Sequence, residues 1–309
     1  MSDFVADPQL VLIHGLFSSP MEFAMISRAL RARGVAFSCL TVPGYTAGST
    51  SLDLSWHRWV DAAETALDAR YGPDTPIVLG GLCSGGAVAA ALALRKRQQD
   101  IRAVVLLSPT FRYDGWAMRG RVRFRRLAYA LGIDRWFSMP EREPFGIKNP
   151  KIRARVLDEI SQGRESSFGP PRLSLRGIRE TERLYASVLG GLSALGAPLF
   201  VLHAREDEIA SLAGLTEALA SAGVEPELTV LENSYHMITI DNDRHVVAER
   251  LADLCTTAAS ACHRVAHVAI PRPLVPISAG QALRGMPVSA KAGPPDLPLN
   301  FPKDAHDYV

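Results

Sequence analysis

The stretch GLCSGG, which contains Cys83 and Ser84, places two potential nucleophiles side by side in a glycine-rich turn. It joins the apolar run PIVLGGL, typical of a buried strand, to an alanine-rich stretch typical of a helix. A nucleophile held on a sharp turn between a strand and a helix follows the spacing glycine-x-nucleophile-x-glycine, because neighbouring backbone passes too close for a Cβ at either glycine. Gly81 and Gly85 satisfy this spacing for Cys83, whereas a leucine stands two positions before Ser84. The spacing therefore predicts Cys83 as the nucleophile.

The turn taken alone leaves other interpretations open. A tight connection between a strand and a helix with a buried thiol would fit the same residues. Glycine-rich turns also bind phosphates, but the pattern G-x-G-x-x-G and a P-loop lysine are both missing. Gly86 directly follows Gly85, and we expect it to be part of the same sharp turn.

An oxyanion hole is predicted from the loop after the first apolar run, LVLIHG. In acyl transfer, a backbone N–H of this loop and the N–H that follows the nucleophile hold the developing negative charge. Those donors would be Leu16 and Ser84, so Ser84 would act through its amide and not its hydroxyl. We expect Gly15 to allow the close approach and His14 to structure the loop.

An acid and a base follow two later apolar runs. Asp207, in VLHAREDE, is the best-placed orienting carboxylate; Glu206 and Glu208 flank it and are expected to be solvated, although spacing alone does not exclude them. His236, in NSYHMITID, lies in the loop after the last apolar run. The chain order nucleophile, acid, histidine is here Cys83, Asp207, His236. It is the order of the fold that holds its nucleophile on a sharp turn between a strand and a helix, and other folds with such triads have a different order.

These motifs, in this order, resemble the α/β-hydrolase superfamily over about residues 9–260, in its branch of compact carboxylesterases and monoglyceride-lipase-like enzymes. The usual serine of that branch is replaced by Cys83, as in the dienelactone hydrolases and polyhydroxyalkanoate synthases of the superfamily. The resemblance implies an α/β-hydrolase fold, a doubly wound and mostly parallel sheet with an inserted helical lid.

The elements needed for such a fold alternate along the chain. Near-continuous apolar runs are typical of strands that are buried on both faces of a parallel sheet, and period-3.6 patterns between them indicate helices. The expected strands cover 10–15, 36–43, 76–82, 101–109, 198–204 and 227–233. The expected helices cover 20–33, 53–70, 84–98, 211–222 and 242–262.

A long interruption of this alternation sets the domain organisation, because nearly 90 residues pass without a convincing core strand. We expect four parts. They are a first part of the core at 1–111, an inserted helical lid at 112–196, a second part of the core at 197–263, and a proline-rich, extended or disordered tail at 264–309.

Composition excludes several classes of function. A net charge of +2 gives no general reason to bind nucleic acid, and no apolar run approaches the roughly 20 residues of a membrane span. The remaining cysteines, Cys39, Cys255 and Cys262, form no CxxC pair or metal-binding cluster and are expected to be small core residues. We expect neither metal nor cofactor. The N-terminus lacks the pattern of a signal peptide, so a cytoplasmic location is expected.

The predicted reaction is cleavage of a carboxylic ester or thioester through an acyl-cysteine intermediate. The alternative is an acyltransferase that moves the acyl group from coenzyme A or a carrier protein to an acceptor; a third hypothesis is a non-catalytic binding module on a hydrolase scaffold. A basic stretch in the predicted lid bears on this choice, because an anionic donor could dock there. Its arginines are Arg119, Arg121, Arg123, Arg125 and Arg126.

Overall fold

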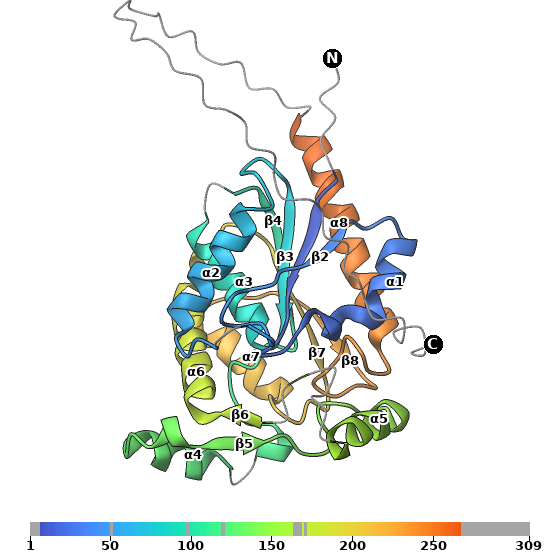
Figure 1. Ribbon diagram of the computed structural model, residues 1–309. Coiled ribbons are helices and arrows are strands. Elements are labelled where there is room, and N and C mark those ends of the chain that lie inside the picture. Colours follow the sequence, from blue (N-terminus) through green and yellow to red (C-terminus); the bar gives the residue numbers. More distant parts are fainter. Residues whose placement is uncertain are drawn as a thin grey trace, which may run out of the picture.

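A six-stranded, all-parallel sheet forms the centre of the molecule in the computed structural model (Figure 1). Its strand order is β2-β1-β3-β4-β7-β8. The strands are β1 (Gln9–Ile13), β2 (Phe37–Cys39), β3 (Ile77–Leu82), β4 (Ile101–Leu107), β7 (Leu199–Ala204) and β8 (Glu227–Leu231). The structure describes residues 7–266 except 50–51, 97–98, 119–120, 163–168 and 170–171. All six expected strands are therefore present, each somewhat shorter than its apolar run.

Helices cover both faces of this sheet (Figure 1). Alternation along the strands explains why both faces are apolar: Leu10 and Leu12 pack with α1 and α8, whereas Val11 and Ile13 face the opposite layer. The first layer consists of α1 (Ala24–Ala32) and α8 (Arg244–Ala266). The second consists of α2 (Trp56–Asp68), α3 (Ser84–Arg95), α6 (Leu175–Gly191) and α7 (Leu212–Ser221).

The strand order reverses direction between β1 and β3. From β1 the chain moves outward to β2 and then crosses to the other side of β1, where β3, β4, β7 and β8 follow in turn. In open parallel sheets, ligands bind outside the carboxyl ends of the strands at such a reversal. The loop that begins at His14 and the turn at Cys83 both lie there.

The long interruption between β4 and β7 lies outside the central sheet. It contains η2 (Trp116–Met118), α4 (Arg121–Ala130), η3 (Asp134–Trp136), β5 (Ser138–Pro140), α5 (Pro150–Ser161), β6 (Arg172–Ser174), α6 and η4 (Leu192–Ala194). β5 and β6 pair with each other as a small antiparallel sheet. We call residues 112–174 the cap segment.

The C-terminal part of the expected lid behaves differently. Helix α6 packs against α3 and α2 in the helical layer on the sheet, with Leu184, Tyr185 and Val188 buried there. The expected lid at 112–196 was therefore too long, because its C-terminal part, α6, belongs to the helical layer on the sheet. The apolar residues of α6 follow the usual helical period. This period predicts a helix but does not tell whether the helix packs on the sheet or belongs to the cap segment.

None of the helices in the described ranges is long and apolar enough to cross a membrane. The expected tail at 264–309 lies outside the described residues, except for its first three, which continue α8.

Candidate active site

Cys83 occupies a strained turn between β3 and α3. Its backbone has φ 55° and ψ −123°, a conformation that L-residues rarely adopt, and its amide donates a hydrogen bond to the Leu107 carbonyl. A Cβ on Gly81 would lie 2.5 Å from the Ile13 carbonyl oxygen, and one on Gly85 would lie 2.2 Å from the same atom. Both glycines are therefore required by the close approach of the β1 backbone, and the turn presents the thiol at the end of the sheet.

Gly85→Ala is expected to destabilise the fold by more than about 3 kcal/mol, because backbone cannot move aside as a flexible side chain does. Besides the Ile13 carbonyl, the new methyl would meet the His14 carbonyl oxygen at 2.3 Å. The matched control is Gly190→Ala, at a helical position where the Cβ meets nothing within 4 Å. We expect this control to be neutral or stabilising by about 0.5–1 kcal/mol in urea denaturation. Equal midpoints for the two variants would contradict the packing argument.

An acid–base pair lies beyond the ends of β7 and β8. Asp207 Oδ2 accepts a hydrogen bond from His236 Nδ1 at 2.8 Å, and its Oδ1 accepts from the amides of Ile209 (2.8 Å) and Ala210 (2.9 Å). Both side chains are buried. The carboxylate therefore fixes the orientation of the imidazole.

The charges of this pair favour a protonated histidine. Burial alone would lower the pKa of His236, but Asp207 and Cys83 together raise it well above its usual value. Burial alone would raise the pKa of Asp207, but the charge and hydrogen bond of His236 hold it below its usual range. Such an arrangement stabilises an imidazolium next to the Cys83 sulfur.

Thr110, which the sequence analysis did not single out, also contacts Cys83. Its buried hydroxyl lies 3.2 Å from Cys83 Sγ. Thr110 follows β4 by three residues, and no local motif marks it, because only the neighbouring position of β4 in the sheet brings it to Cys83.

Ser84 points away from the cavity. Its side chain is fully buried, and its hydroxyl lies 2.7 Å from the Tyr45 hydroxyl, which also donates to the His14 carbonyl. Its amide opens helix α3, where the helix dipole favours negative charge. The structure thus separates the two adjacent residues: a thiol in the cavity and a hydroxyl in the core.

The loop after β1 is anchored on both sides. His14 Nε2 lies 2.7 Å from Thr46 Oγ1, and burial lowers the pKa of this histidine to about 4, so it is neutral. The Gly15 amide donates to Glu22 Oε2 at 2.7 Å. Leu16 follows and lines the same cavity as Cys83.

A cavity of about 170 Å³ opens on Cys83 and His236. Most of its wall is apolar, and the cap segment supplies much of it. The apolar lining residues include Leu16, Met118, Met139, Pro140, Phe145, Ile147, Val156, Ile160, Leu173, Ile178, Ile209 and Met237. Such a wall suits a hydrocarbon chain.

The two glutamates beside Asp207 lie in different environments. Glu206 is exposed and pairs with Lys148 at 2.7 Å, whereas Glu208 is buried, lines the cavity and accepts a hydrogen bond from the His236 amide at 3.2 Å. The expectation that both are solvated was therefore wrong for Glu208. Burial and the neighbouring Asp207 raise the pKa of Glu208 to about 7.

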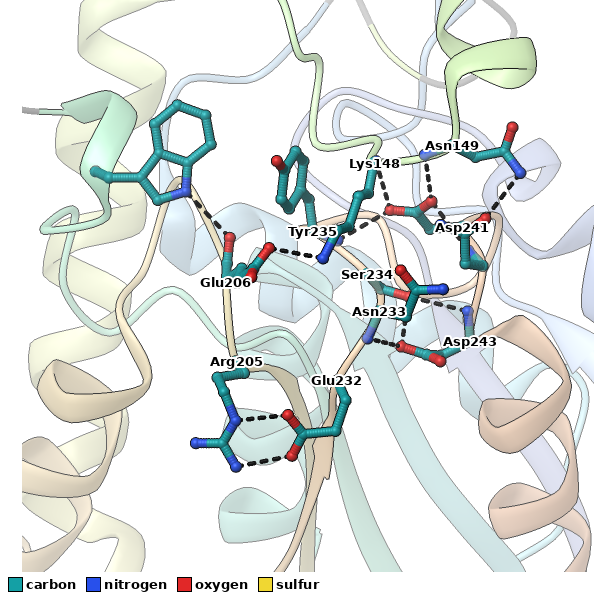
Figure 2. A network of polar contacts seen from close by, with 12 residues as sticks. Lys148, Asn149, Arg205, Glu206, Glu232, Asn233, Ser234, Tyr235, Asp241 and Asp243 are labelled. Carbon is teal, nitrogen blue, oxygen red and sulfur yellow. Dashed lines mark hydrogen bonds and ion pairs between the residues drawn. The ribbon is translucent and has the colours of Figure 1, made fainter.

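Asp241 connects the histidine loop to the cap segment (Figure 2). This fully buried carboxylate accepts hydrogen bonds from the backbone amides of Lys148 (2.7 Å), Asn149 (2.8 Å), Tyr235 (2.9 Å) and Asn242 (2.9 Å). Close by, the ion pair between Lys148 and Glu206 adds a second connection from the cap segment to the acid loop (Figure 2). The histidine and the cap segment are thus held as one unit.

Asp241→Asn should lower the free energy of unfolding by about 2–4 kcal/mol, since an amide has one acceptor oxygen for four N–H groups and leaves some of them unpaired. It should also reduce kcat, because the loop of His236 loses its anchor. The control is Glu232→Gln at the exposed pair with Arg205, which should leave the urea midpoint almost unchanged because solvent screens an exposed ion pair. Urea denaturation measures both; a cost within 0.5 kcal/mol for Asp241→Asn would contradict the anchoring role.

Of the five arginines considered for docking an anionic donor, the structure describes the side chain of Arg125 alone, and this side chain is buried. Arg125 is 4% exposed, pairs with Glu182 of α6 at 2.7 Å and lies over the Tyr113 ring, so it joins the cap segment to the helical layer. Arg121, Arg123 and Arg126 belong to α4, but their side chains, like all of Arg119, lie outside the described residues.

Within the described ranges, no three or more histidine, cysteine, aspartate or glutamate side chains gather as a metal site. Cys39 and Cys255 are buried free thiols, as expected for core residues, and the side chain of Cys262 is not described.

Comparisons with known proteins agree with this architecture. The sequence profile of the Alpha/beta hydrolase family matches residues 10–250. A thermostable monoacylglycerol lipase from Bacillus sp. (strain H-257) is 22% identical over 247 residues, covering 78% of this chain and 87% of that protein.

Two solved structures extend the comparison. A soluble variant of monoglyceride lipase from Saccharomyces cerevisiae, in complex with a substrate analogue, superposes with a TM-score of 0.65 at 16% identity, covering 82% of this chain and 88% of that one. A thioesterase domain from the curacin biosynthetic pathway gives 0.51 at 18% identity, covering 82% and 92%. At these identities the likeness concerns the fold.

Proposed function

Because this chain belongs to the alpha/beta hydrolase family, we propose that it hydrolyses carboxylic esters or thioesters of apolar acyl groups through an acyl-cysteine intermediate. Cys83 is the nucleophile, and His236 is the base and acid. Asp207 orients the histidine and favours its protonated form. The observation that carries the proposal is the hydrogen-bonded pair of Asp207 and His236 beside a thiol on the strained turn.

The first half of the reaction forms the thioester. The Cys83 thiolate attacks the carbonyl carbon, and the amides of Leu16 and Ser84 hold the oxyanion at the N-terminus of α3. The C–S bond forms, the bond to the alcohol or thiol breaks, and the protonated His236 gives its proton to that leaving group. Loss of one such oxyanion donor typically costs about 2.7–4 kcal/mol.

In the second half, water attacks the thioester carbonyl while His236 takes the proton. The C–S bond breaks, the acid leaves, and the thiolate next to the imidazolium is restored. The apolar wall of the cavity supports an acyl chain as the bound group, and the monoacylglycerol lipase relative makes a monoacylglycerol the first ester to test.

Transfer of the acyl group to or from coenzyme A or a carrier protein remains the alternative outcome. The buried position of Arg125 weakens the charge argument for an anionic donor. The binding-module hypothesis has no observation in its favour, since an acid, a base and a nucleophile are together.

The test is intact-mass spectrometry after brief incubation with p-nitrophenyl esters, a monoacylglycerol and acyl-coenzyme A, quenched in acid, with peptide mapping. We expect an acyl adduct on the peptide of Cys83 that disappears in water with release of free acid. Release only after an acceptor thiol or alcohol is added would make the protein an acyltransferase. An adduct on Ser84, or no adduct and no turnover with any donor, would overturn the proposal.

A further inference from the structure

A buried carboxyl group lies at the site without a part in the reaction described so far. Glu22, in η1 (Pro20–Phe23), is 3% exposed and lines the cavity together with Cys83 and His236. Nothing in its local sequence marks it, because the fold of the loop after β1 brings it to the site.

Glu22 is packed against the oxyanion loop and the nucleophile. Its Oε2 accepts the hydrogen bond from the Gly15 amide, one residue before Leu16. A Cβ placed on Gly15 would lie 3.1 Å from Glu22 Oε1 and 3.7 Å from Cys83 Cβ, so carboxyl, loop and nucleophile surround one point. A change at Glu22 therefore acts on the peptide that leads into the Leu16 donor.

The surroundings favour the neutral acid over the carboxylate. Burial raises the pKa of Glu22 to about 7, against the hydrogen bonds of Gly15 and Ser18 and the charge of His236, which lower it. The other titratable groups that face it are the Cys39 thiol and the Tyr45 phenol; His14, on the same loop, is neutral. Glu22 therefore changes charge near neutral pH.

We propose that Glu22 is a positioning residue whose charge controls acyl transfer: as a neutral acid it holds the Gly15–Leu16 peptide for the oxyanion, and as a carboxylate it opposes that negative charge. The inference rests on the proposed function. Two negative charges a few ångströms apart in a partly desolvated site slow formation of the oxyanion by about tenfold or more. Thioester formation thus slows as the pH rises through neutrality.

The decisive variant is Glu22→Gln, which keeps an acceptor for the Gly15 amide and removes the charge. The measurement is kcat/KM for a neutral p-nitrophenyl ester from pH 5.5 to 9. We expect the ratio of Glu22→Gln to wild type to rise about fivefold or more between pH 6 and pH 8.5. Glu217 is an exposed glutamate that pairs with Arg112 and does not line the cavity, so the ratio for Glu217→Gln should stay constant. A constant ratio for Glu22→Gln as well would overturn the proposal.

A second variant tests the positioning half. Glu22→Leu removes both the charge and the acceptor, so we expect kcat at least about tenfold below that of Glu22→Gln at every pH. If the leucine variant folds and matches Glu22→Gln, the hydrogen bond to Gly15 does not position the loop and this half of the proposal is wrong.

A readout without substrate separates this proposal from the proposed function. A carboxyl group whose pKa is raised in the folded state stabilises the fold at low pH, and that contribution is lost as the pH rises from the unfolded value through about 7. Tm should therefore fall less for Glu22→Gln than for wild type between pH 5 and pH 8. The raised pKa of Glu208 contributes to the fall equally in both proteins.

Equal falls in Tm would show that Glu22 is not a neutral acid and would overturn the proposal. If wild type is active and the kcat/KM ratio is flat, only this proposal fails; if neither protein processes any ester, the proposed function fails first.

Discussion

Cys83→Ala should abolish acyl-enzyme formation and lower kcat/KM by about 10⁴-fold or more, because the thiol that forms the covalent bond is removed. The adjacent Ser84→Ala should stay within a few-fold of wild type in activity. Its cost is one of stability, about 1 kcal/mol, since the Tyr45 hydroxyl loses a partner at 2.7 Å. The two variants change neighbouring residues of one turn and so form a matched pair.

The measurement is ester turnover together with labelling by iodoacetamide at low excess. Cys83→Ala should lose rapid labelling, whereas Ser84→Ala should keep it. Cys83→Ser should retain only part of the activity. A hydroxyl can still form the acyl intermediate, but His236 would have to remove a proton from a much weaker acid than a thiol. If Ser84→Ala is the inactive variant, the assignment of the nucleophile is wrong.

The core of the fold was predictable because its signals are local. Apolar runs identify strands buried on both faces, and the glycine spacing around Cys83 reflects backbone that passes within 2.5 Å of a missing Cβ. The order of the acid and the histidine after two late strands also placed Asp207 and His236, and the structure brings these two together at 2.8 Å.

The residues that the sequence did not predict depend on tertiary contacts. Glu22 and Thr110 reach the site only because β1, β3 and β4 are neighbours in the sheet. Glu208 looked solvated in a run of charged residues, yet the packing of the segment around Gly115 against its backbone buries it. Arg125 looked like a surface charge, but Glu182, about two turns into helix α6, is its partner in the folded protein.

The assignment of Asp207 as the acid leads to the second large effect. Asp207→Asn should lower kcat/KM by about 10³–10⁴-fold, because the amide keeps the shape of the carboxylate but not the charge that favours the imidazolium. Since Asp207 raises the pKa of His236 and the protonated form exists below that pKa, the variant should lose activity at a lower pH than wild type on the alkaline side. Kinetics from pH 5.5 to 9.5 measure both changes.

The neighbouring glutamates provide the comparison for this assignment. Glu206→Gln, on the same loop but exposed and paired with Lys148, should stay within a few-fold of wild type with an unshifted alkaline limb. Glu208→Gln changes a buried carboxyl that accepts a hydrogen bond from the backbone amide of His236 and not from its ring, so it should alter stability more than the pH profile. Of these three acidic residues, only Asp207 hydrogen-bonds the imidazole ring, so the alkaline limb should move most in Asp207→Asn. A shift on Glu208→Gln that Asp207→Asn lacks would transfer the role of the acid to Glu208 and leave the acyl-cysteine chemistry in place.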